Sequence, residues 1–149
     1  MITLKVKEKE VVLNATMKKI VNFTKNEKIE NLKDSFFKNM SKVNYEFLAK
    51  LILNLADDGA KKFNNDYNKI YDFIEEWGEE NDYDYENLYQ IIADEINTKS
   101  FFGKKMSEEE MKSAINDPLS NFDIDQVLNK TAEKVMGEIV EEEFKGYKG

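Results

Sequence analysis

The chain has 149 residues and a formal net charge of −8, from 30 acidic side chains and 22 basic side chains that are all lysine. It contains no histidine, no cysteine and no arginine. These absences remove the imidazole base, the thiol nucleophile, the soft metal ligands and the bidentate phosphate clamp, which argues against most classes of enzyme. The negative charge repels a phosphate backbone and so argues against nucleic-acid binding.

The N-terminal residues predict a β-hairpin over residues 2–13. Ile2, Leu4 and Val6 alternate with polar residues, and an apolar run at 11–13 that begins with two β-branched valines follows a polar break. No signal peptide is visible, and the longest apolar runs contain three residues. A spanning helix needs about 20. We therefore expect a cytoplasmic protein that does not enter a membrane.

Apolar residues at helical spacing predict three helices after the hairpin. The first follows a cap at Asn14 or Thr16, and the second spans residues 29–40. The most apolar helix begins at Asn44, and we expect Gly59 to end it. Five residues form its apolar stripe: Phe47, Leu48, Leu51, Ile52 and Leu55.

Two further helices are predicted around an acidic segment. One opens at Asp66 and is expected to end at Gly78, and the next is capped by Asp84. Residues 72–86 contain eight carboxylates in fifteen positions. Three of them alternate as in a calcium loop, but the glycine and the final glutamate that such a loop requires are missing. The segment is either a solvated loop or an acidic surface for a partner, and we expect no metal and no cofactor.

Aromatic residues are dense just before and within the acidic segment. The set comprises Phe63, Tyr67, Tyr71, Phe73 and Trp77. Their carboxylate neighbours would repel nucleic acid, so stacking on bases is disfavoured. Packing in a core and contact with another protein both remain open.

The C-terminal third predicts a separable part of the chain. Ser107 and Glu110 have the spacing of a capping box, and the only proline, Pro118, follows a short helix. A long amphipathic helix is expected over 123–140. It carries Ile124, Val127, Leu128, Val135 and Ile139, which can pack on its own core or on another chain. The expected division is a helical domain at 1–103 and a variable tail at 104–149.

The predicted fold class is therefore mainly α, with a short hairpin and a compact bundle of about five to six helices. Its C-terminal helix can detach from the bundle. The order of parts resembles a known family. The hairpin ITLKVKEKEVVLNAT leads into the helix MKKIVNFTK, the apolar helix NYEFLAKLILNLADDG follows, and then comes the acidic, tryptophan-bearing YDFIEEWGEENDYDYENLYQIIADEI. Over residues 2–102 this resembles the tail assembly chaperones of siphophages and prophages of low-GC Gram-positive bacteria.

The resemblance implies a protein without catalytic, cofactor or metal residues. It implies binding to the tape measure protein, which is kept soluble, and recruitment of tail tube subunits. It also implies a place in the host cytoplasm and absence from the mature virion. Self-association along the client is a further expectation.

The expected partner surfaces are the two apolar stripes. They comprise Phe47, Leu51 and Leu55 in the central helix and Ile124, Val127, Leu128, Val135 and Ile139 in the last one. Three alternatives stay open: an acidic nucleic-acid mimic that inhibits a host defence enzyme, a structural subunit of the virion, and an enzyme acting through carboxylates alone.

Overall fold

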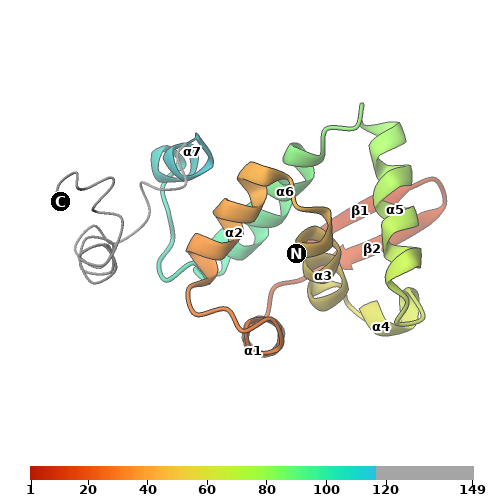
Figure 1. Cartoon of the computed structure of the whole chain (residues 1–149), viewed down its shortest axis with the longest axis horizontal. Coiled ribbons are helices and arrows are strands. Elements are labelled where there is room, and N and C mark those ends of the chain that lie inside the picture. Colours follow the sequence, from red (N-terminus) through yellow and green to blue (C-terminus); the bar gives the residue numbers. More distant parts are fainter. Residues whose placement is uncertain (117–149) are drawn as a thin grey trace, which may run out of the picture.

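A computed structural model of the chain describes residues 1–116, which form a two-stranded antiparallel hairpin followed by seven helices. The elements are β1 (Ile2–Val6), β2 (Lys9–Leu13), α1 (Met17–Asn26), α2 (Leu32–Lys42), α3 (Tyr45–Leu55), α4 (Gly59–Lys62), α5 (Tyr67–Glu80), α6 (Tyr85–Thr98) and α7 (Glu108–Asn116). Figure 1 shows the hairpin beside α5 at one end of the molecule and α7 toward the other. The predicted fold class is confirmed, and the helix expected over 123–140 lies outside the described residues.

The hairpin buries one face. Leu4 pairs with Val11, and Ile2 pairs with Leu13. Because every second residue of a strand points to the same face, these four side chains share one side of the ribbon. Leu4, Val11 and Leu13 are buried there, and β1 packs against α5. Such a ribbon is marginal alone, so its stability comes from this packing.

Helix α3 lies at the centre of the core. Leu48, Ala49, Leu51, Ile52 and Leu55 are all fully buried. The helix contacts α1, α4 and α5. Its stripe therefore faces the protein's own interior.

Helix α3 ends at Leu55 because the chain then pairs with the hairpin. Ala56 is extended and forms a β-bridge with Leu13, and the Asn14 N–H donates to the Leu55 carbonyl at 2.9 Å. The expectation that Gly59 ends this helix is wrong. Gly59 is buried and begins α4, where a Cβ would lie 2.3 Å from the Leu53 carbonyl oxygen.

Four predicted helix starts are confirmed, because each depends on a local side-chain cap, whereas the helix predicted over 29–40 begins later, at Leu32, behind a cap at Asn31. Four caps accept a backbone N–H in the first turn: Thr16, Asn44, Asp66 and Asp84. The capping box is also present, with the Glu110 N–H donating to Ser107 Oγ at 3.1 Å and the Ser107 N–H to Glu110 Oε1 at 2.8 Å.

Residues after Gly103 share the core of the preceding helices. Met106, Met111 and Ala114 are buried in the same cluster, and α7 packs against α2. Residues 104–116, the first thirteen residues of the predicted tail, therefore pack with the helices that precede the predicted boundary at residue 103.

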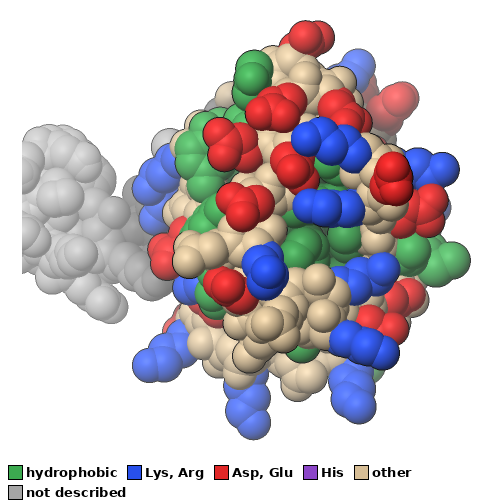
Figure 2. All heavy atoms as spheres, turned by 90° about the vertical axis from the view of Figure 1, so that its right-hand side faces the viewer, with side chains coloured by type: hydrophobic (Ala, Val, Ile, Leu, Met, Phe, Trp, Pro, Cys, Tyr) green, Lys and Arg blue, Asp and Glu red, His purple; other side chains and the backbone are tan. Residues whose placement is uncertain are grey.

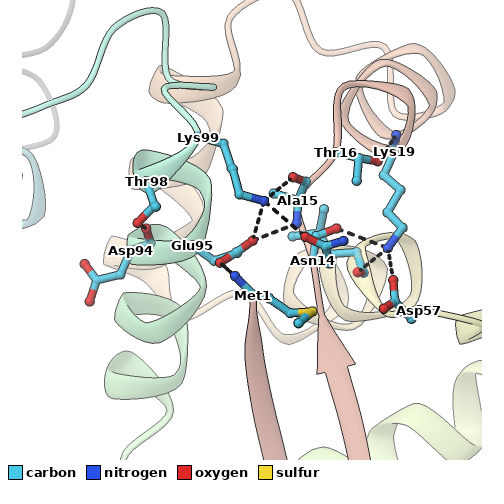
Figure 3. Close-up of polar contacts among 11 residues, drawn as sticks. Met1, Asn14, Ala15, Thr16, Lys19, Asp57, Asp94, Glu95, Thr98 and Lys99 are labelled. Atoms are coloured by element: carbon cyan, nitrogen blue, oxygen red, sulfur yellow. Dashed lines mark hydrogen bonds and ion pairs between the residues drawn. The ribbon is translucent and has the colours of Figure 1, made fainter.

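A buried carboxylate joins the N-terminal segment to α6. Glu95 accepts hydrogen bonds from the Met1 amino group at 2.5 Å, from the Ala15 N–H at 2.9 Å and from Lys99 Nζ at 3.3 Å. Figure 3 shows these donors converging on Glu95, while Asp94 points away from them. Burial raises the Glu95 pKa, but the three donors outweigh burial and hold this pKa below its ordinary value.

We expect Glu95→Gln to lower the free energy of unfolding at neutral pH by about 2 kcal/mol, because hydrogen bonds to a buried, charged acceptor are lost. Because the pKa is lowered in the folded state, the Glu95 carboxylate contributes fully to the free energy of unfolding above its ordinary pKa of 4.5. This contribution disappears as the pH falls through the folded-state pKa. This part of the pH dependence should be absent in the variant. Urea unfolding between neutral and acidic pH measures both effects. Asp94→Asn, at the exposed neighbour, is the control, and an equal loss in both variants would contradict the assignment.

Candidate partner-binding face

The predicted interface residues of the central helix belong to the core. Leu51 and Leu55 are 0% exposed, so a partner cannot reach them without unfolding α3. Phe47 is half-buried, and its ring makes edge contacts with Phe23 and Phe36 at centroid distances of 5.6 Å and 6.4 Å. The accessible surface for a partner must lie elsewhere. The predicted contacts at Ile124, Val127, Leu128, Val135 and Ile139 lie outside the described residues.

Four of the seven exposed large hydrophobic side chains of the described residues are tyrosines. Tyr45, Tyr67, Tyr71 and Tyr83 are 50%, 40%, 37% and 61% exposed. They come from the first turn of α3, from α5 and from the loop before α6. Together with the half-buried Tyr85 they are named the tyrosine face.

Tyr85 connects the members of this face. Its ring makes an edge contact with Tyr45 at 5.4 Å between centroids, and it lies 6.5 Å from Tyr83 and 6.3 Å from the buried Trp77. A hollow of about 380 Å³ opens between the rings. It is lined by Tyr45, Tyr71, Ile74, Glu75 and Tyr85 and is named the tyrosine pocket.

Gly78 determines where the Tyr85 ring lies. A Cβ at Gly78 would be 2.2 Å from the Tyr85 hydroxyl oxygen and 2.6 Å from its Cζ. Tyr85 therefore packs directly on the backbone of α5. The expectation that Gly78 ends this helix is wrong, because α5 continues to Glu80. The glycine makes room for a ring from the next helix.

One carboxylate, Glu75, lines the tyrosine pocket, and it also lines a neighbouring hollow together with three other acidic residues of α5 and with Lys7 and Lys9 of the hairpin. Asp72, Glu75 and Glu79 have no ion pair with any described residue, whereas Glu76 binds Lys9 Nζ at 3.0 Å and Lys7 Nζ at 3.6 Å. Figure 2 shows acidic side chains gathered over the upper part of the side that carries α5, with lysines among them and around the lower rim.

Two pKa shifts agree with this distribution of charge. Burial and then the Glu75 carboxylate raise the pKa of Tyr85. The hydrogen bond from Lys9 lowers the pKa of Glu76, despite a smaller opposing effect of burial. The pocket therefore lies in a negative field, while the charge of Glu76 is compensated by the hairpin.

The aromatic set found in the sequence divides between core and surface. Phe63, Phe73 and Trp77 are buried, whereas Tyr67 and Tyr71 are exposed one turn apart on α5. The remaining members of the face, Tyr45, Tyr83 and Tyr85, were not predicted. The presence of a hydroxyl was the available signal, since tyrosine tolerates a wet edge and phenylalanine does not.

The described residues also contain other candidate sites. No group of three or more acidic residues within residues 1–116 is placed to hold a metal ion. A second hollow of about 300 Å³ lies between α6 and α7, with Asn97 and Met106 in its lining. None of the described helices is both long and apolar enough to cross a membrane.

Comparison of the chain with protein-family models, with curated proteins and with solved structures finds no match. The functional argument therefore depends on the residues and on the geometry of the tyrosine face.

We expect Gly78→Ala to displace the Tyr85 ring while leaving the protein folded, because the obstructing atoms are the far end of a side chain. A gain in helix propensity of about 1 kcal/mol offsets part of the cost. The emission of Trp77 should change, while the free energy of unfolding stays within about 1 kcal/mol of wild type. Gly59→Ala is the matched contrast, because its Cβ meets backbone, and it should destabilise by about 1–3 kcal/mol. Equal destabilisation with unchanged emission in Gly78→Ala would contradict this account of Tyr85.

Proposed function

We propose that this chain is a non-enzymatic phage tail assembly chaperone. It binds the tape measure protein, keeps it soluble and helps to recruit tail tube subunits. The observation that carries the proposal is the tyrosine face, an exposed aromatic surface bordered by carboxylates without ion pairs among the described residues.

A surface of this kind suits contact with another polypeptide. Tyrosine offers a large apolar area, loses little side-chain entropy when it is fixed, and keeps its hydroxyl solvated. Tyr67 and Tyr71 follow each other at helical spacing on α5, and the ring of Tyr45 makes an edge contact with the ring of Tyr85 beside them. The strip they form fits the apolar side of a client helix.

The client in the proposed chaperone role has apolar helical surfaces that match the tyrosine face. A long helical tape measure protein exposes apolar stripes until the tail tube encloses it, and such stripes promote aggregation. A binding protein with a net charge of −8 adds solubility to the complex. We propose that it acts in the host cytoplasm and leaves the finished tail.

The order of elements supports the resemblance to this family. The hairpin leads directly into α1, the apolar α3 is central, and the acidic α5 carries the only tryptophan before α6. These are the parts on which the resemblance over residues 2–102 depends.

The nucleic-acid mimic is the less favoured alternative. A mimic presents ordered rows of free carboxylates in place of phosphates. Here Glu76 pairs with two lysines, and Glu80 accepts a hydrogen bond from the Lys7 N–H at 3.1 Å. The hairpin thus engages part of the acidic run, which interrupts such a row.

We expect co-expression with this chain to move the tape measure protein into the soluble fraction. The double variant Tyr45→Ser/Tyr71→Ser should return most of the client to the pellet, because it removes apolar contact area from the tyrosine face. The matched control is Met17→Ser/Val21→Ser, which alters an exposed apolar pair on α1 with exposed fractions of 69% and 52%. Thermal unfolding of each variant establishes that it is folded.

A client that pellets equally with and without the wild-type chain contradicts the chaperone role. Competition of the chain with DNA for a nuclease would instead favour the mimic.

A further inference from the structure

We propose that the tyrosine pocket receives the cationic side chain of a lysine or arginine from the polypeptide that this chain binds. The inference rests on the proposed function only in assigning that polypeptide to the tape measure client. It adds a specific site and a specific side-chain chemistry to the binding face.

Three rings from three separate elements line this open hollow. Tyr45 begins α3, Tyr71 lies in α5 and Tyr85 begins α6. The face of each aromatic ring carries partial negative charge, so a cation held near several rings is attracted by all of them. The volume of about 380 Å³ is at the small end for a ligand pocket, which suits one side chain.

The remaining lining residues complement the two parts of a basic side chain. Ile74 offers apolar contact to the methylene stem. Glu75 lines the same hollow and has no ion pair with any described residue, so its carboxylate is available to the charged head. Asp72 and Glu79 lie three residues before and four residues after Glu75 on the same helix and strengthen the negative field.

The chain's own lysines near the pocket are engaged elsewhere. Lys7 and Lys9 bind Glu76, and Lys50 of α3 binds Glu27 Oε1 at 3.0 Å. No lysine is among the residues that line the hollow in the described chain. None of the lysines within residues 1–116 therefore fills this site, which leaves it open to a cation from a bound polypeptide.

The pocket is also fixed before a ligand arrives. Gly78 allows the Tyr85 ring to rest on α5, and the rings of Tyr45 and Trp77 contact it from other directions. A ring held in place loses less entropy on binding, which favours the binding of a ligand in this pocket.

The test titrates the full chain with short alanine-based peptides that differ at one central residue. Aromatic NMR signals report on the tyrosines, and Trp77, the only tryptophan, gives a fluorescence signal beside Tyr85. The lysine and arginine peptides should shift the ring signals of Tyr45, Tyr71 and Tyr85, and a norleucine peptide should not. Tyr45→Leu and Glu75→Gln should each weaken the titration about two- to fivefold. Met17→Leu, at an exposed apolar residue of α1 outside the lining set, should leave it unchanged.

Equal shifts with the norleucine peptide would overturn the proposal, because the site would then be apolar only. Shifts with tetramethylammonium but not with the lysine or arginine peptide would also overturn it, in favour of a small organic cation. Failure of the pocket and failure of the chaperone role are distinguishable. Peptides that do not bind, with a client that stays soluble, refute the pocket alone; peptides that bind, with a client that pellets, support the pocket and refute the chaperone role.

Discussion

The burial of α3 is the constraint on which the rest of the structure depends. Its apolar stripe is enclosed by α1, α4 and α5, and removing one such side chain, as in Leu51→Ala, costs about 2–5 kcal/mol in a typical core. Hydrogen bonds secure the end of the helix as well. The Asn14 N–H and Lys19 Nζ both donate to the Leu55 carbonyl, and Ala56 pairs with the hairpin. Figure 3 shows Lys19 reaching toward this junction from α1. A helix held in this way is unavailable as a binding surface.

Burying α3 has a consequence for the surface. The helix turns its leucines inward, and Tyr45 in its first turn is left outward beside α5 and α6. The same division recurs in α5, where Phe73 and Trp77 face the core while Tyr67 and Tyr71 face solvent. The hairpin contributes by pairing its lysines with Glu76, which leaves the unpaired carboxylates next to the tyrosines. Core, charge and binding face therefore follow from one packing arrangement.

The sequence predicts the parts of this fold that are determined locally. Thr16, Asn44, Asp66 and Asp84 cap helices through contacts within one turn, and alternation over the hairpin is visible in a few residues. Gly59 and Gly78 were misread because their roles depend on distant partners, a helix end bonded to β2 and a ring from α6. The candidate site was misplaced for a related reason. A leucine stripe has the same spacing whether it faces a core or a partner, and only the packing of α3 distinguishes the two.

The central claim is that this chain acts by binding a polypeptide through its tyrosine face and not through the stripe of α3. Hydroxyl-radical footprinting of the chain, alone and with the tape measure client, tests this directly. The account predicts that Tyr45, Tyr71 and Tyr85 become protected in the complex while the exposed Met17 on α1 is oxidised as before. Protection of Met17 with unchanged oxidation of the three tyrosines would contradict it.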